Sequence, residues 1–155
     1  MRMMMPGLRD RRTVDELLTL FFRQYDLGAF RRAVGAMTRF YCLRVPPIRW
    51  FEYLDWGKGA GRTFEDGTIH LVHPENWKRG RKYNTMKQWI HTVHHEIGHY
   101  VLWTDAERKA DVFASGMMHG LEHEAAARAL APRPAMRTRL IGTRRSVGRR
   151  RSSCV

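Results

Sequence analysis

The sequence predicts an α+β fold, with a small three-stranded sheet packed against two consecutive helices and further helices at the N-terminus. Apolar residues recur at three- and four-residue steps near the N-terminus and again from residue 86, which is the periodicity of amphipathic helices. Between these segments lie runs rich in β-branched and aromatic residues, as expected of strands. The 155 residues are the usual size of one domain, so these elements are expected to share one core.

Two helices are predicted in the N-terminal part of the chain. Thr13 and Glu16 match a capping box, so the first helix is expected to begin after Thr13. Asp26 is expected to cap a second, short helix over residues 27–37. The apolar face of the first helix comprises Leu17, Leu18, Leu20, Phe21 and Tyr25.

Three strands are predicted next. Residues 48–56 are rich in β-branched and aromatic side chains and predict the first strand. The dipeptide Asp66-Gly67 is a signal for a two-residue hairpin turn. Residues 62–65 and 68–72 are therefore expected to form the two arms of a hairpin.

The clearest helix signal spans residues 84–103, where Thr85 and Gln88 match a second capping box. Thr104 and Glu107 match a third and predict that another helix follows at once. The apolar face of the helix over 84–103 comprises Met86, Trp89, Ile90, Val93, Ile97, Tyr100 and Val101. Gly98 lies inside this helix, where glycine costs about 1 kcal/mol relative to alanine, so we expect a close approach to the helix at that point.

Positive charge is concentrated at the C-terminal end of the chain. The net charge of the chain is +13. Nine arginines lie between residue 125 and the end of the sequence, and no Asp or Glu lies there. The rest of the chain has 19 basic and 15 acidic residues. We therefore expect one domain over residues 1–130 and an Arg-rich, disordered tail over residues 131–155. Such a tail either stays solvated or binds nucleic acid or another polyanion.

Nothing in the sequence indicates a membrane or secreted protein. There is no run of 18 apolar residues, and the first residues lack the apolar stretch of a secretory signal. Cys42 and Cys154 are the only cysteines, and Cys154 is next to the last residue, so no structural disulfide is expected. These features favour a cytoplasmic protein with no membrane partner.

The most informative stretch is His95-Glu96-Ile97-Gly98-His99, in the middle of the helix predicted over residues 84–103. Histidines four residues apart lie on one face of a helix, so both imidazoles can reach one Zn²⁺ at about 2.1 Å from each nitrogen. Glu96 is rotated by about 100° from His95, so it cannot easily be a ligand beside it. It can instead accept a proton from a water in the open coordination position. The pattern therefore predicts two zinc ligands and a general base.

A third ligand is expected from the next helix. Glu107 lies eight residues after His99 and is the expected ligand. Asp111 lies four residues further on and faces the same way as Glu107. It is expected to accept a hydrogen bond from the far nitrogen of a ligand histidine, which fixes the orientation of the ring.

Other residues are alternatives for the third ligand. Asp105 has the position of the last ligand in the pattern HExxHxxGxxH, but Leu102 replaces the glycine that this pattern requires. His119 and His123 are further alternatives near the end of the following helix.

A peptidase also needs a hydrogen-bond donor that stabilises the developing oxyanion. The sequence offers four candidates for this donor: Tyr83, Tyr100, His91 and His119.

The two helical segments together resemble the gluzincin metallopeptidases, most closely the ImmA/IrrE-like group. In that group HExxH is followed by a helix with the pattern Glu-x-x-Ala-(Asn/Asp)-x-Phe-Ala, which is similar to residues 107–114 here. The resemblance covers roughly residues 45–118. It implies a zincin-like fold, in which the small sheet packs against the HExxH helix and the ligand-bearing helix. It also implies one Zn²⁺ and a peptidase role toward partner proteins.

These features predict a zinc metalloendopeptidase. Glu96 would take a proton from a water activated by zinc, and the resulting hydroxide would attack the peptide carbonyl. An extended protein or peptide substrate is expected to pair with an exposed edge of the strand near residues 68–72. The alternative, from another class, is a regulatory or nucleic-acid-binding protein with a non-catalytic zinc site, in which the basic tail binds the partner.

Overall fold

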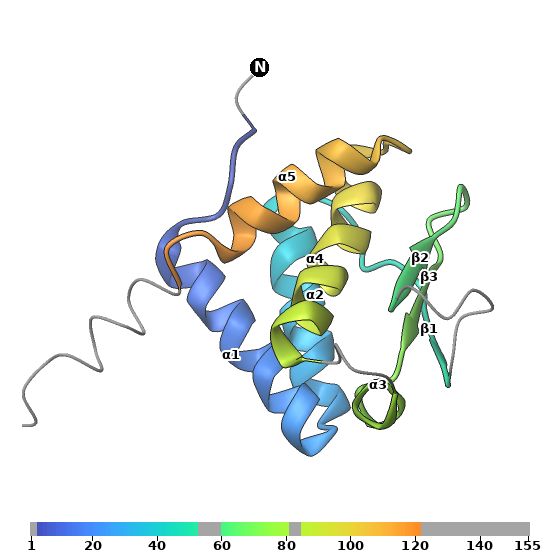
Figure 1. Ribbon diagram of the computed structural model, residues 1–155. Coiled ribbons are helices and arrows are strands. Elements are labelled where there is room, and N and C mark those ends of the chain that lie inside the picture. The colour runs from blue at the N-terminus through green and yellow to red at the C-terminus, as the bar shows by residue number, and fades with distance from the viewer. Residues whose placement is uncertain (1–2, 53–59, 81–84, 122–155) are drawn as a thin grey trace, which may run out of the picture.

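The computed structural model describes residues 3–52, 60–80 and 85–121, which form an α+β arrangement of five helices and a three-stranded mixed sheet (Figure 1). The helices are α1 (Leu8–Gln24), α2 (Leu27–Phe40), α3 (Pro74–Arg79), α4 (Met86–Leu102) and α5 (Glu107–Met118). The strands are β1 (Ile48–Phe51), β2 (Gly61–Thr63) and β3 (Ile69–Val72). None of the helices in these ranges has the length and apolarity needed to cross a membrane. The tail predicted over residues 131–155 lies outside the described residues.

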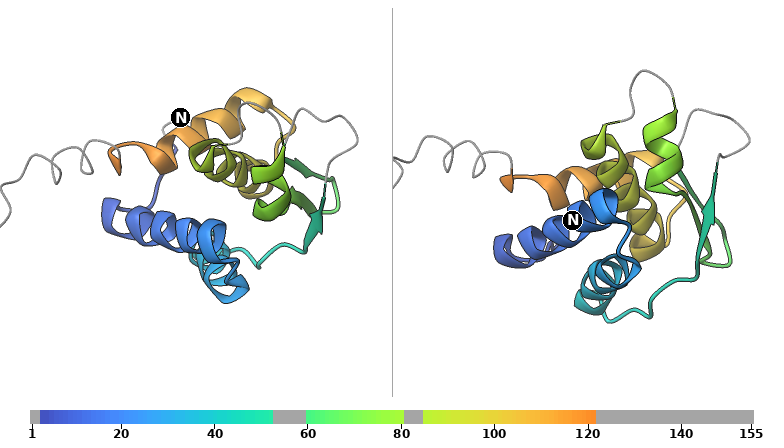
Figure 2. Two further views of the ribbon diagram at one scale, coloured as in Figure 1. Left: turned by 60° about the horizontal axis from the view of Figure 1, so that its bottom comes forward. Right: turned by 90° about the horizontal axis from the view of Figure 1, so that it is seen from below.

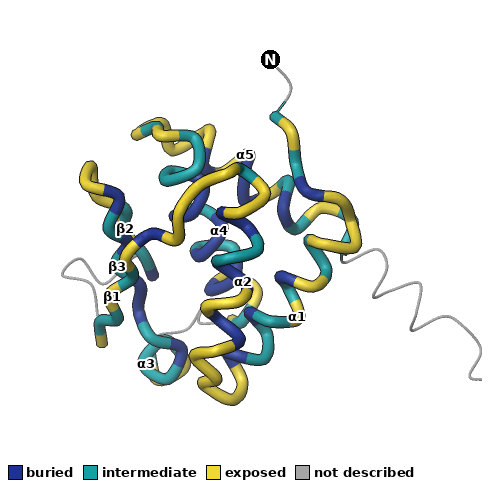
Figure 3. The backbone as a smooth tube through the Cα atoms, turned by 180° about the vertical axis from the view of Figure 1, so that it is seen from behind, coloured by how far each residue is buried: buried dark blue, intermediate teal, exposed yellow. Residues whose placement is uncertain are grey.

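Helix α4 lies at the centre of the molecule. The sheet lies on one side of α4, α1 and α2 lie on the other side, and α5 packs across it (Figures 1 and 2). Figure 3 shows that α4 carries mostly buried and half-buried residues, whereas α1 and α2 have exposed outer turns. The helix that carries the histidine motif is therefore held on several sides by the rest of the fold.

An aromatic cluster joins α4 to the N-terminal helices and to the sheet. The ring of Phe21 lies 5.0 Å from that of Phe30, 5.1 Å from that of Trp50 and 5.8 Å from that of Trp89, measured between centroids. Trp89 is fully buried, and its indole N–H donates to the carbonyl oxygen of Val72 at 3.0 Å. This bond satisfies the one polar atom of a large apolar side chain. Trp89 therefore packs α4 against β3 without leaving a buried N–H group unpaired.

Two of the predicted helix caps are confirmed. The Asp26 carboxylate accepts hydrogen bonds from the N–H groups of Gly28 and Ala29, and α2 begins directly after it. Thr85 and Gln88 form the reciprocal capping box at the start of α4. Both caps depend on residues at most three positions apart, so the sequence alone contains the whole interaction.

The predicted cap at Thr13 is wrong, because α1 begins at Leu8. The hydroxyl of Thr13 instead donates to the carbonyl oxygen of Arg9 inside the helix, at 3.1 Å. The additional turn is held by a contact that is distant in sequence. Arg11 donates to the carbonyl oxygen of Gly116 at the end of α5, at 3.0 Å, and so stabilises both helix ends.

The sheet has the order β1-β3-β2, with β1 parallel and β2 antiparallel to β3. The expectation that the strand near residues 68–72 has an exposed edge is therefore wrong, because β3 pairs on both sides. Among the described strands the edges are β1 and β2. Because β1 occupies one edge of β3, β2 pairs with the other edge, and there it contacts α4.

The hairpin between β2 and β3 has a three-residue loop, in place of the predicted two-residue turn. The N–H of Gly67 donates to the carbonyl oxygen of Phe64, and the N–H of Phe64 donates to that of Thr68, both at 2.9 Å. Gly67 has φ of 84°, whereas Asp66 has no positive φ. This is the pattern of a type I turn followed by a left-handed glycine.

Gly98 lies where α5 crosses α4, which confirms the expected close approach. A methyl group added at Gly98 would lie 3.0 Å from Cδ1 and 3.1 Å from Cβ of Phe113. Phe113 is fully buried, so neither its ring nor its Cβ can move away without disturbing the core.

We expect Gly98→Ala to destabilise the protein by roughly 1–3 kcal/mol through overpacking, despite the helix propensity of about 1 kcal/mol that it gains. Gly116→Ala in α5 is the matched control, since its added methyl would meet only the flexible end of Met5. The control is expected to be neutral or stabilising. Urea unfolding measures both, and a Gly98→Ala protein as stable as wild type would contradict the packing.

Candidate metal centre

Three side chains from α4 and α5 converge at one point. Nε2 of His95 lies 3.1 Å from Nε2 of His99 and 3.0 Å from Oε2 of Glu107, and Nε2 of His99 lies 3.5 Å from Oε1 of Glu107. Within the described parts of the chain, these residues form the group with the spacing of a metal site. Neither Asp105 nor His119 belongs to this group, and His123 lies outside the described residues.

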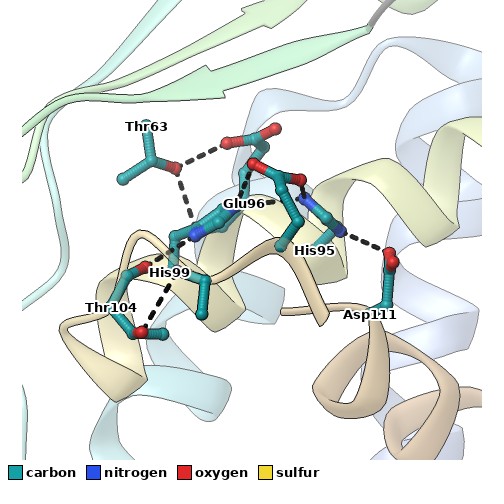
Figure 4. A network of polar contacts seen from close by, with 8 residues as sticks. Thr63, His95, Glu96, His99, Thr104 and Asp111 are labelled. Carbon is teal, nitrogen blue, oxygen red and sulfur yellow. Dashed lines mark hydrogen bonds and ion pairs between the residues drawn. The ribbon is translucent and has the colours of Figure 1, made fainter. Parts of the chain in front are cut away.

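The hydrogen bonds of the two rings assign their tautomers. Nδ1 of His99 lies 2.7 Å from the carbonyl oxygen of Thr104, and Nδ1 of His95 lies 2.8 Å from Oδ1 of Asp111 (Figure 4). A carbonyl or carboxylate oxygen can only accept, so each Nδ1 carries the proton. In a neutral ring Nε2 is then unprotonated and presents a lone pair.

With both rings neutral, three acceptors face one another with no donor between them. Lone pairs of two imidazoles and a carboxylate repel at these distances unless a cation lies between them. Four ligands placed tetrahedrally about 2.0–2.1 Å from Zn²⁺ are about 3.3 Å from one another. The two nitrogens are 3.1 Å apart, and they lie 3.0 Å and 3.5 Å from the two oxygens of Glu107, which is close to that spacing. The residues fit a zinc ion in both donor chemistry and spacing.

The turn between α4 and α5 brings Glu107 to the histidines. Trp103 ends α4 in the left-handed conformation, with φ of 48°, and the N–H of Thr104 donates to the carbonyl oxygen of His99. The chain then reverses, and α5 begins at Glu107 with Ala106 as its N-cap. The predicted capping box of Thr104 and Glu107 is therefore wrong. The Glu107 carboxylate lies against the histidines and is not available to the N–H of Thr104.

Glu96 points away from the two imidazoles toward β2. The hydroxyl of Thr63 donates to Oε2 of Glu96 at 2.6 Å (Figure 4). The residue is only 6% exposed, and burial raises the pKa of its carboxyl group, whereas the hydrogen bond from Thr63 lowers it. Thr63 is a site residue that lies outside both sequence motifs. Its only sequence signal is its alternating position in the predicted hairpin arm over residues 62–65.

A cleft of about 740 Å³ opens between β2, its hairpin loop, α4 and the start of α5. This volume lies within the range of roughly 300–1,000 Å³ that is typical of ligand sites. The residues that line it include Gly61, Thr63, His95, Glu96, His99 and Glu107. The three acceptors and the carboxylate of Glu96 therefore open onto the same space.

The candidate oxyanion donors differ in position. His91 lines the cleft one turn before His95, with 6.5 Å between the ring centroids. Tyr100 also lines the cleft, but its hydroxyl donates to the carbonyl oxygen of Arg44 at 2.8 Å. His119 lies at the far end of α5, and Tyr83 lies outside the described residues.

Comparisons with known proteins give no relative for this arrangement. No protein-family model matches the chain, and no curated protein or solved structure matches it either. The function of the site therefore has to be inferred from its own residues.

Glu107→Ala is expected to abolish stoichiometric zinc binding, because it removes one of the three acceptors. Zinc per chain is measured by mass spectrometry after dialysis against a weak chelator. Asp105→Ala is the matched control on the same turn and is expected to retain the wild-type zinc content. Equal zinc content in Glu107→Ala and wild type would rule out Glu107 as a ligand.

Asp111→Ala is expected to weaken zinc affinity by about 10–100-fold, because the carboxylate that orients the His95 ring is lost. Competition with a chromogenic chelator measures the affinity. Asp111→Asn keeps an oxygen acceptor for Nδ1 of His95, so it should lose less zinc affinity than Asp111→Ala. An Asp111→Ala protein with wild-type affinity would show that the bond to His95 does not support the ligand.

Proposed function

We propose that this chain is a zinc metalloendopeptidase with a zincin-like fold. The observation that carries the proposal is the convergence of His95, His99 and Glu107 beside the carboxylate of Glu96, in one open cleft. The order of elements supports it as well. An antiparallel edge strand, a helix with HExxH and a following helix with a glutamate surround that cleft.

Zinc held by His95, His99 and Glu107 would supply a Lewis acid that acidifies water and polarises a peptide carbonyl. Glu96 performs the proton transfer. Within the described residues its Oε1 has no hydrogen-bond partner, whereas its Oε2 is held by Thr63. Oε1 accepts a proton from the attacking water, and the carboxyl group then gives this proton to the leaving amine nitrogen.

The edge of β2 is the expected docking site for an extended substrate. The hydrogen bonds from Phe64 to Thr68 and from Val72 to Ala60 alternate along the β2–β3 pair. The N–H and C=O groups of Gly61 and Thr63 therefore point away from β3. A peptide that pairs with them adds a strand next to Glu96. This strand replaces residues 68–72 as the proposed substrate-binding edge.

Glu96→Gln is expected to retain zinc and to lower peptide cleavage by about 10²–10⁴-fold, since the amide cannot act as a general base. Cleavage of a mixture of quenched fluorescent peptides measures the rate, and zinc content is the control for an intact site.

A Glu96→Gln protein that cleaves at the wild-type rate would exclude the mechanism. The regulatory alternative predicts a different result. In that case the wild type does not cleave peptides, and deletion of residues 131–155 removes binding to a polyanion.

A further inference from the structure

The hydroxyl group of Thr63 lies between β2 and the buried side of Glu96. Oγ1 lies 2.6 Å from Oε2 of Glu96 and 3.0 Å from its backbone oxygen. A hydroxyl has one proton, and the shorter contact to a charged acceptor takes it. The described residues offer no second donor to this carboxylate, so Thr63 alone determines which oxygen is held (Figure 4).

The aliphatic part of Glu96 is also in contact with β2. A methyl group added at Gly61 would lie 2.6 Å from Cγ of Glu96 and 2.9 Å from Cδ2 of Leu71. Gly61 and Thr63 are two residues apart in a strand, so they lie on the same face of the sheet. Gly61 therefore leaves room for the stem of Glu96, and Thr63 holds its end.

We infer that Thr63 is a positioning residue for Glu96. This inference rests on the proposed peptidase function. Its hydrogen bond holds Oε2 and leaves Oε1 without a hydrogen-bond partner among the described residues, in a side chain that lines the cleft. When Glu96 takes a proton, an O–H bond of the water breaks and the new O–H bond forms at Oε1. The O–H bond of Thr63 stays intact throughout.

The position of Thr63 also couples the base to the substrate. Its side chain faces Glu96, while its backbone groups belong to the outward edge of β2. One residue therefore binds the proton acceptor and forms part of the edge on which a peptide would pair. Loss of the hydroxyl leaves the backbone edge in place but releases the carboxylate.

The test compares Thr63→Val, which removes the hydroxyl but keeps the shape and the strand propensity, with Thr63→Ser, which keeps the hydroxyl. Zinc content, kcat and KM for quenched fluorescent peptides are measured for both. Thr63→Val is expected to retain zinc, to keep KM within about twofold and to lose about 10–100-fold in kcat, as expected for a displaced catalytic group. Thr63→Ser should recover most of the wild-type kcat.

Crystal structures of both variants without metal supply a readout that does not depend on activity. In Thr63→Ser, Oε2 of Glu96 should stay within hydrogen-bond distance of the new hydroxyl. In Thr63→Val, the carboxylate should leave its wild-type orientation. A Thr63→Val protein with wild-type kcat, or with Glu96 unmoved, would overturn the inference.

The outcomes separate this inference from the proposed function. If the wild type cleaves and Glu96→Gln does not, the peptidase proposal stands, and equal kcat in Thr63→Val and wild type contradicts only the role of Thr63. If the wild type cleaves no peptide, the proposed function fails and the positioning role for a catalytic base fails with it.

Discussion

The fold brings together three side chains whose arrangement, with both imidazoles neutral, favours a cation between them. Two imidazoles one turn apart on α4 have their Nε2 atoms 3.1 Å from each other and 3.0–3.5 Å from oxygens of the Glu107 carboxylate. Side chains free to rotate would separate, so other contacts must hold them. Asp111 and the carbonyl oxygen of Thr104 bind the far nitrogens and fix both rings. Both acceptors come from the segment after α4, so the docking of α5 brings the candidate metal-binding residues together.

The remaining packing explains how α5 docks and why the cleft stays open. Gly98 lets Phe113 approach the α4 backbone, and Arg11 of α1 binds the far end of α5. On the opposite side the aromatic cluster around Trp89 fixes α4 against β3. The short strand β2 then lies beside Glu96. Helix α4 therefore presents His95 and His99 to α5 and Glu96 to the sheet, and these three residues line one cleft.

The parts that were predictable from sequence depend on short separations along the chain. The caps at Asp26 and Thr85 and the spacing of His95 and His99 are set within four residues, where local geometry decides. The approach of Glu107 to the histidines depends only on the turn after α4 and on the helix that follows it.

Contacts between distant segments were not predictable. The central position of β3 depends on the parallel pairing of β1, and the early start of α1 depends on Arg11 reaching α5. The usual capping residues do not indicate the short helix α3, because the side chain of His73 caps it. The hydrogen bond from Thr63 to Glu96 joins residues 33 positions apart, so no local pattern encodes it.

The most direct test of the metal centre is anomalous diffraction at the zinc edge from crystals of the zinc-loaded wild-type protein. One strong peak per chain is expected, about 2.0–2.2 Å from Nε2 of His95, Nε2 of His99 and a carboxylate oxygen of Glu107. Glu96 is expected to lie outside bonding distance of the metal and still to accept a hydrogen bond from Thr63. A peak elsewhere on the chain, a zinc ion ligated by Glu96, or no stoichiometric zinc would contradict the account.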